Sequence, residues 1–593
     1  MQITRYIKEA VLQCLSHLYP DQLFSEKDFQ LNQTKPEFEG DYTVVLFSLV
    51  KTLKQSPEKI GAAMGGFLTD RYKEDFSSYN IIKGFLNLTI SDRYWLRFLE
   101  QTYQDSNYGR SSSKGKKVVI EFSSPNTNKP LHVGHLRNNF LGESIAAILS
   151  AYGYDTVNTC IVNDRGIHIC KSMLAWQLFS GGETPDSTHK KGDHFVGDYY
   201  VKFNDEYTRQ VARLKNEGMS EERAKKEAPV MKATQDMLVK WEQGDPEILS
   251  LWQRMNEWVY AGFDETYRRI GSHFDKVYYE SQTYLLGKKY VDEGLENGVF
   301  YKEEDGSVWI DLTADGLDKK LLLRSDGTSV YITQDLALVK EKWDDFKPDS
   351  SIYVIGDEQN YHMKVLKLIC EKARIPSADK IYHLSYGMIE LPTGKMKSRE
   401  GTVVDADDLM DEMIAVSKAQ TNERGKVADF SADELVALYE MIGIGAMKFY
   451  LLRVDPKKKM VFNPEESIDL DGFTGSFVQY THARTRSVLR KEQPVSDYSL
   501  QDEMLEPLEK ALLIQLEQYP AMIEQAATEY NPSVIAAYVY YLAKAFNSFY
   551  NKHSIINAES AEKKQLRLRL CQLTSHVIAA GMQLLRIRVP ERM

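Results

Sequence analysis

The segment 117–162 constrains the fold of this chain more than any other stretch. Lys117–Phe122 is a short, β-branched run typical of a buried strand, and Thr156–Val162 is a second candidate strand. Between them the pattern predicts a polar loop and then a helix over Gly134–Tyr152. A strand, a helix and a second strand in this order predict a β-α-β unit and therefore a parallel sheet. Open sheets of this kind bind ligands in the loops that follow their strands, so the loop after Phe122 is the first candidate site.

The whole chain predicts a multidomain protein, because 593 residues are too many for one hydrophobic core. We expect an N-terminal α+β domain at 1–108 and a parallel-sheet α/β domain at 109–430. A charged, helical insertion at about 170–300 splits this second domain, and 431–593 forms an all-helical bundle. Further strands are expected at Gly84–Ile90, Ser307–Leu312, Ser351–Ile355 and Ile381–Tyr386, with a hairpin over Leu321–Thr333 that turns at Asp326-Gly327.

Composition excludes several classes of protein. The net charge of −11 excludes a chain that is basic all over, although it leaves room for local clusters of Lys and Arg. The five cysteines are scattered and form no CxxC pair, which predicts buried thiols rather than disulfides or a zinc cluster. There is no uninterrupted apolar run of about 18 residues and no targeting signature, so we expect a cytoplasmic protein with no membrane partner.

The loop after the first strand contains a phosphate-binding pattern. His132 and His135 lie on one side of the turn that begins the predicted helix, and Gly134 lets the backbone approach a ligand closely. A helix N-terminus attracts phosphate, and two imidazoles can donate hydrogen bonds to its oxygens as charge develops during nucleotidyl transfer. A metal site or a pair of core histidines is the alternative. No cysteine or third ligand lies nearby, and a loop rich in Pro and Asn is a poor core, so we expect no protein-bound metal.

A second, basic loop at Gly394–Gly401 follows the predicted strand Ile381–Tyr386 and contains Lys395. A run of charges is most often a solvated surface loop. Its occurrence together with the His132–His135 motif favours an active-site loop instead.

These two motifs resemble the signature pair of class I aminoacyl-tRNA synthetases. Within that class the chain is similar to the arginyl-tRNA synthetases over almost its whole length. The resemblance is carried by the following segments: Glu121–Asn126, Lys129-Pro130, His132–Arg137, the C-terminal Val589–Met593, and Gly40–Tyr42 with Gly84–Asn87 in the N-terminal domain. It implies a Rossmann-like catalytic domain, an N-terminal domain that contacts the tRNA elbow and an anticodon-binding helical bundle.

The resemblance also implies an activity. L-Arginine would be activated by ATP as arginyl-adenylate and transferred to the 3′ end of tRNA(Arg), with Mg²⁺ bound to the ATP phosphates. The enzyme would be a monomer whose arginine activation needs bound tRNA. Catalytic roles fall on Lys129, His132, His135 and Lys395, and ATP binding involves these residues together with Gly134, Met396 and Ser398.

The arginine site implied by the family consists of Glu121, Asn126, Tyr331, Asp335 and Gln359. The chemistry agrees, because a guanidinium is a planar fork of donors that two carboxylates can hold with good geometry. Glu121 and Asp335 therefore form a plausible selectivity pair, and a structural salt bridge is the alternative for either acid.

Two motifs depart from the family pattern. Ser398 stands where the signature has its second lysine, and the resemblance implies that Lys129 substitutes for that lysine. A contribution of Lys397 or Arg399 is left open. Asn163–Gly166 stands where the family has Gly-Asp-Trp-Gly, so Arg165 replaces an aromatic residue and is given no role.

A predicted helix around residues 473–491 interleaves aromatic and basic side chains. This pattern suits single-stranded nucleic acid, because bases stack on rings while cations contact phosphates. An amphipathic core helix is the alternative. We assign Tyr480, Arg484 and Arg486 to tRNA binding.

Three other functions remain as rivals. A synthetase for another amino acid would need a pocket without paired acids. An RNA-binding paralogue without catalysis would not need the intact histidine motif or Lys395. A small-molecule nucleotidyltransferase would have no use for the terminal domains.

Overall fold

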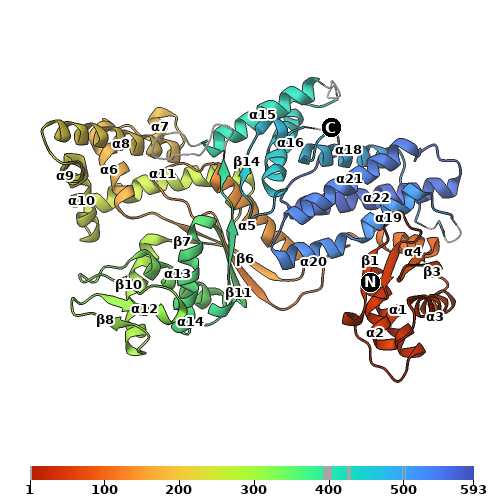
Figure 1. Cartoon of the computed structure of the whole chain (residues 1–593). Coiled ribbons are helices and arrows are strands. Elements are labelled where there is room, and N and C mark those ends of the chain that lie inside the picture. The colour runs from red at the N-terminus through yellow and green to blue at the C-terminus, as the bar shows by residue number, and fades with distance from the viewer. Residues whose placement is uncertain are drawn as a thin grey trace.

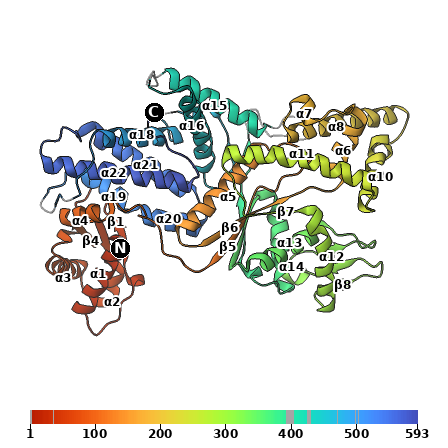
Figure 2. The same cartoon turned by 180° about the vertical axis from the view of Figure 1, so that it is seen from behind.

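The computed structural model describes residues 3–35, 37–390, 404–423, 429–469, 471–496, 498–500 and 503–593. The parallel-sheet domain lies at the centre of an elongated molecule (Figure 1). The helical insertion extends from one side of it, and the C-terminal helices with the N-terminal unit lie on the other, as the view from behind also shows (Figure 2). The expected multidomain α/β and all-α class is confirmed.

A five-stranded, fully parallel sheet organises the centre. Its strand order is β12-β11-β5-β6-β7, which places the first predicted strand in the middle. β5 is buried along nearly its whole length, as expected of a strand covered on both faces. The strands are β5 (Lys117–Glu121), β6 (Asp155–Val162), β7 (Lys276–Tyr279), β11 (Ser350–Gly356) and β12 (Ile381–Tyr386).

Helix α5 (Val133–Ala151) follows β5 and packs closely on the sheet. A Cβ atom at Gly142 would lie 2.2 Å from Cγ of Phe122, so only glycine permits this approach. The fully buried Arg137 donates to the carbonyl oxygens of Gly387 at 2.5 Å and Lys458 at 3.0 Å. It therefore joins α5 to the chain that follows β12 and to the short Lys457–Lys459 run.

The insertion between β6 and β7 is helical, as expected, but it is shorter than expected. The chain returns to the sheet as β7, which lies inside the range that we expected to be helical. This strand has only four residues between two long helices, too few for an alternating pattern to stand out. The helices are α6 (Ile167–Phe179), α7 (Pro185–Thr188), α8 (Gly192–Asn216), α9 (Glu221–Glu227), α10 (Pro229–Glu242) and α11 (Pro246–Ile270).

A small antiparallel sheet with its own core follows β7. The expected turn at Asp326-Gly327 is present, with the Arg324 N–H donating to the Thr328 carbonyl at 2.9 Å. The expected second strand is wrong, because helix α13 begins at Tyr331. The elements are α12 (Glu280–Glu296), β8 (Tyr301–Lys302), β9 (Val308–Ile310), β10 (Lys320–Leu323), α13 (Tyr331–Phe346) and α14 (Asn360–Lys372).

Within the described residues, the N-terminal unit is an antiparallel sheet of order β1-β2-β4-β3 with four α-helices. It packs on the C-terminal helices rather than on the parallel sheet (Figure 1). The Ile3 N–H donates to Oε1 of Glu517 at 2.5 Å, and Nζ of Lys510 lies 2.9 Å from Oδ2 of Asp41. The elements are α1 (Ile3–Leu18), β1 (Gln30–Gln33), β2 (Tyr42–Val45), α2 (Phe47–Leu53), α3 (Pro57–Arg71), β3 (Phe76–Ile82), β4 (Phe85–Ile90) and α4 (Asp92–Thr102).

The C-terminal part is mainly helical. One short strand, β14 (Met460–Val461), was not expected there, and it pairs with β13 (Ile389–Glu390). α16 is long and apolar enough by length and composition to cross a membrane, but 72% of its most apolar window is buried inside the fold, as in a core helix. All five cysteines are free and buried, as expected. The helices are α15 (Ala406–Glu423), α16 (Ala432–Leu452), α17 (Pro464–Ser467), α18 (Gly475–Lys491), α19 (Pro507–Glu517), α20 (Tyr519–Glu529), α21 (Ser533–Lys552) and α22 (Ala561–Leu584).

We predict that Gly142→Ala destabilises the protein even though alanine favours helix. The clash with Phe122 should cost about 1–3 kcal/mol, which outweighs the gain in helix propensity of about 1 kcal/mol. Gly66→Ala in α3 is the matched control, because nothing lies within 4 Å of its added Cβ, and it should stabilise slightly. Chemical denaturation of both variants measures the difference. Equal effects would contradict the close packing of α5.

Candidate active site

The loops that follow the parallel strands converge on one edge of the sheet. A pocket of about 420 Å³ lies there between the β5, β6 and β7 ends, the insertion and α13. It brings the predicted Asn126, Lys129 and Tyr331 together with residues that were not predicted. The unpredicted lining residues with polar side chains are Asn128, Asn163, Arg165, His168, Tyr200 and Glu280.

The loop after β5 has an unusual backbone. Ser123 and Ser124 both have positive φ values, of 84° and 46°, which is a strained conformation for residues other than glycine. Contacts to α5 and to the loop after β6 hold it in place: Asn138 accepts from the Ser123 N–H at 2.5 Å, and Asn163 donates to the Ser124 carbonyl at 3.3 Å. The fold therefore fixes the entry of the chain into the histidine turn.

The two histidines cap helix α5. His132 is the N-cap residue, and its Nδ1 accepts a hydrogen bond from the Gly134 N–H at 3.1 Å. The His132 N–H in turn donates to Nδ1 of His135 at 3.1 Å, and the ring centroids lie 3.9 Å apart. A Cβ at Gly134 would lie 2.9 Å from the His132 ring, so glycine is required beside it.

This capping fixes the protonation of both rings. Because each Nδ1 accepts a backbone N–H, a neutral imidazole carries its proton on Nε2 and presents it as a donor. Burial, with the charge of Lys129, lowers the pKa of His132 to about 4, and burial lowers the pKa of His135 well below its ordinary value. Both rings are therefore neutral donors at physiological pH. Burial also lowers the pKa of Lys129.

The chain that leaves the second motif pairs with the histidine turn. The Val133 N–H donates to the Val404 carbonyl at 3.2 Å, and the Ala406 N–H donates to the Leu131 carbonyl at 3.0 Å. Lys395, Met396 and Ser398, like Lys397 and Arg399, lie outside the described residues. Residues 404–406, which follow that segment in the chain, lie directly beside the histidine turn.

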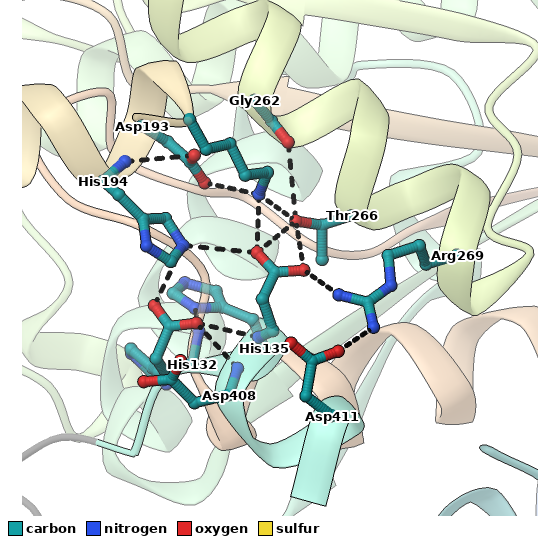
Figure 3. A network of polar contacts seen from close by, with 12 residues as sticks. His132, His135, Asp193, His194, Gly262, Thr266, Arg269, Asp408 and Asp411 are labelled. Carbon is teal, nitrogen blue, oxygen red and sulfur yellow. Dashed lines mark hydrogen bonds and ion pairs between the residues drawn. The ribbon is translucent and has the colours of Figure 1, made fainter. Parts of the chain in front are cut away.

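A network of charges surrounds this junction (Figure 3). Asp407 lies at its centre. Its Oδ2 lies 2.6 Å from Nζ of Lys191, and its Oδ1 lies 3.1 Å from Nη1 of Arg269. Nε2 of His194 lies 3.3 Å from the same carboxylate and 3.4 Å from Oδ2 of Asp405. Burial alone would raise the pKa of Asp407, but the bonds from His194 and Lys191 lower it far below its ordinary value. The network joins the insertion helices α8 and α11 to α15.

The same network resembles a metal site, since Asp193, His194 and Asp407 could together hold a cation. The ammonium of Lys191 already lies 3.1 Å from Asp193 and 2.6 Å from Asp407. We therefore interpret the cluster as an internal ion-pair network.

The predicted arginine-binding residues lie in two places. Glu121, at the end of β5, is buried and forms an ion pair with the buried Lys342 of α13, whose ammonium lies 4.2 Å from the Tyr353 ring. Asp335 lies 2.5 Å from Nε2 of His362, and that contact raises the pKa of the imidazole. The remaining three have exposed side chains: Asn126 and Tyr331 line the pocket, whereas Gln359 ends the short 3-10 turn that follows β11 and lies outside the pocket lining.

Glu280 is an acid that sequence reasoning missed. It follows β7 directly and lines the pocket. Burial raises its pKa to about 7, with the nearby charges of Asp164 and Asp335 acting in the same direction and Arg165 opposing them. Asp164 positions the start of α12, because its carboxylate accepts the N–H and the hydroxyl of Ser281 at 2.8 and 2.7 Å. Because β7 was not predicted, Glu280 was not recognised as a residue at a strand end. Ligand sites of open α/β sheets generally lie at the carboxyl ends of the strands, so a predicted β7 would have indicated it.

The predicted tRNA-binding residues lie on α18. Arg484 stacks 5.0 Å from the ring centres of Tyr480 and Tyr550 and donates to Asn547. Arg486 pairs with Glu591 near the C-terminus at 2.6 Å. Phe473, expected on this helix, precedes its N-cap Thr474.

Comparison with known proteins gives a consistent result. Three family models match: "tRNA synthetases class I (R), catalytic domain" over 99–463, "DALR anticodon binding domain" over 478–593, and "Arginyl tRNA synthetase N terminal domain" over 2–90. The chain is 50% identical to the arginine–tRNA ligase of Bacteroides fragilis and 49% identical to that of Amoebophilus asiaticus, covering all of both proteins. The solved structure of the arginyl-tRNA synthetase of Thermus thermophilus shares the fold, with a TM-score of 0.79, 24% identity, and coverage of 99% of this chain and all of that one.

We predict a pH-dependent contribution of His194 to stability. Its hydrogen bond to Asp407 raises its pKa against the opposing effect of burial, with Asp405 and Asp193 adding to the rise and Lys191 lowering it. A raised folded pKa means that the stabilisation is complete below the unfolded value near 6.5 and is lost as pH rises through the folded value.

The unfolding midpoint of the wild type should therefore exceed that of His194→Gln by about 1–3 °C at pH 6, and the gap should close by about pH 9. Thermal melts across this range test the prediction. A gap that widens with rising pH would contradict it.

Proposed function

The chain belongs to the arginyl-tRNA synthetase family of class I synthetases and catalyses the ATP-dependent ligation of arginine to tRNA, and from that premise we propose how its residues divide the work. The observation that carries the proposal is the pair of neutral imidazoles at the N-terminus of α5, beside a pocket that is lined by the buried acid Glu280.

The histidine turn binds the triphosphate in this proposal. The Nε2–H groups of His132 and His135 donate to phosphate oxygens, and the N-terminus of α5 contributes its positive dipole end. The carboxylate of arginine attacks the α-phosphorus, and pyrophosphate leaves. Lys129 and Lys395 stabilise the charge that spreads over the phosphates. Magnesium enters as part of the ATP substrate and supplies further charge neutralisation.

Arginine binds with its guanidinium toward Glu280 of the pocket and the nearby Asp335. Asp335 lies close enough to Glu280 for its charge to raise the pKa of the Glu280 carboxyl. A bound guanidinium relieves this repulsion and offers a fork of donors to both, which lysine cannot do. Asn126, Tyr331 and Gln359 complete the arginine site. Glu121 acts together with Lys342, because their ion pair fixes the carboxylate at the end of β5.

The terminal domains bind tRNA(Arg). Arg484 between Tyr480 and Tyr550 forms an aromatic–cation platform suited to an unpaired base, and Arg486 lies two positions further along α18. The N-terminal unit contacts the tRNA elbow. The enzyme acts as a cytoplasmic monomer, and bound tRNA supports arginine activation.

We predict that His132→Asn strongly slows activation without unfolding the protein. Asparagine is a good N-cap residue that can still accept the Gly134 N–H, but it has no ring Nε2–H to reach the phosphates. Arginine-dependent exchange of labelled pyrophosphate into ATP, with tRNA present, should fall by about 10²–10³-fold, as when one oxyanion donor is lost. The unfolding midpoint should stay near that of the wild type. Near-normal exchange would remove His132 from the site, and exchange with another amino acid would overturn the assignment of arginine.

We also predict that arginine binding weakens as pH falls through about 7. Only the carboxylate form of Glu280 attracts a guanidinium, and burial raises the pKa of this group to about 7, so protonation below that value should raise KM for arginine. Glu280→Gln should raise KM for arginine about 10–100-fold, consistent with the loss of about 1.5–3 kcal/mol from a charged hydrogen bond.

The variant should also lack the pH dependence near 7, while KM for ATP stays unchanged. An equal rise in both Michaelis constants would assign Glu280 a structural role.

A further inference from the structure

A second pocket lies where the insertion meets the C-terminal helices. Its volume is about 500 Å³, and its walls come from the end of α11, from α16 and from the chain that follows α22. Both views show α11 running from the insertion to this junction (Figures 1 and 2). Five cations and one acid line it: Arg268, Arg269, Lys448, Arg586 and Arg588 with Glu440.

Two of the five cations are neutralised within the protein. Arg269 pairs with Asp407 and Asp411, and Nε of Arg586 lies 3.1 Å from Oε2 of Glu143. For the other three, the described residues supply no ion-pair partner. Nε of Arg268 donates only to the Asp264 carbonyl, and its side chain, like that of Arg588, is exposed. The pocket therefore carries an excess of positive charge in a chain whose net charge is −11.

Lys448 shows that this excess is built into the fold. Only 5% of it is exposed, and its Nζ donates to the Arg586 carbonyl at 2.8 Å and lies 5.4 Å from the Phe140 ring. Burial and the nearby Arg586 and Arg588 lower its pKa to about 8, although the charge of Glu143 opposes this. An ammonium has three donors, and burying it without an ion-pair partner is costly. An anion in the pocket would offset that cost.

The position of the pocket identifies the anion. Arg269 belongs both to this pocket and to the network around Asp407 beside the histidine turn. On the other side, α16 and α22 pack on α18, which carries Arg484. A tRNA whose acceptor end reaches the histidine turn and whose anticodon loop reaches α18 must pass between these sites.

We propose that this pocket binds phosphodiester groups of the tRNA backbone between the acceptor end and the anticodon loop. Arg268 and Arg588 contact phosphate oxygens from the rim, where the planar guanidinium matches them well, and Lys448 supplies charge from the floor. The site is distinct from the arginine and ATP pocket. It rests on the proposed function, since it takes the same tRNA as its ligand.

The test is the double variant Arg268→Gln/Arg588→Gln. Its matched control is Lys347→Gln/Lys380→Gln, which removes the same charge at exposed positions. These two lysines precede β11 and β12, so they lie at the end of the parallel sheet opposite to the candidate active site. Binding of tRNA(Arg) is measured by filter retention across a salt series. We expect the pocket variant to bind about tenfold more weakly and its salt slope to fall by roughly 1.4–1.8, since each lost phosphate contact removes about 0.7–0.9.

The aminoacylation rate at saturating tRNA should stay within about twofold of the wild type, because no group of the adenylate site changes, while KM for tRNA rises. Ethylation interference should identify individual phosphates whose modification weakens the wild type but not the pocket variant. Lys448→Met, which removes the buried charge, should weaken tRNA binding further.

Three outcomes would overturn the proposal. Unchanged affinity and salt slope would exclude the pocket from the tRNA interface. An equal loss in the control variant would assign the effect to long-range charge. Tight binding of inorganic phosphate that the pocket variant abolishes, with unaltered tRNA affinity, would define a small-anion site instead. A wild type that binds tRNA but never charges it would refute the proposed function while leaving this binding test valid.

Discussion

The backbone pairing between the histidine turn and residues 404–406 is the contact on which the rest of the site depends. It joins two segments that are distant in sequence, one entering α5 and the other entering α15. Two hydrogen bonds alone would be weak. The network around Asp407 reinforces them, because α8, α11 and α15 each contribute a charged side chain to one partly buried cluster. Separating these elements would leave Asp407 or Lys191 without its partner in a partly buried site, which is costly for an ion pair. The insertion is therefore part of the scaffold of the active site.

The position of α5 follows from close packing at one end and capping at the other. Gly142 lets the helix approach Phe122, and Arg137 ties it to the chain after β12. The N-terminus that results is held by its own histidines, whose Nδ1 atoms accept backbone N–H groups. Each histidine ring thus combines a structural and a chemical role. Its Nδ1 caps the start of the helix, and this hydrogen bond also fixes the tautomer in which Nε2–H can donate to a ligand. A substitution there has to be judged on both roles.

The sequence predicted the sheet better than it predicted the pocket. β5, α5, β6, β11 and β12 were expected within a residue or two, because buried β-branched runs and a long helix leave strong patterns. β7 was missed, since four residues between long helices carry no periodicity, and with it Glu280 was missed.

The ion pair of Glu121 with Lys342 joins residues from β5 and α13, and no local sequence pattern indicates a contact between residues so far apart in the chain. Motif residues could be found from spacing, whereas their partners could not. The packing of the N-terminal unit on the C-terminal helices was likewise beyond any local signal.

In the proposed function the three substrates meet three kinds of chemistry. The Glu280 carboxylate, whose pKa is raised by burial, lines the pocket proposed for arginine. The second pocket is lined by cations, three of which have no ion-pair partner among the described residues. The histidine turn uses neither, since its imidazoles are neutral donors. In the proposed mechanism this difference has a catalytic reason. A fixed positive charge at both histidines would bind the triphosphate strongly before reaction and would gain less as the transition state forms. Neutral donors hold the ground state more weakly, and their hydrogen bonds strengthen as charge builds on the phosphate oxygens. The low pKa of the two rings therefore favours stabilisation of the transition state over tight binding of ATP.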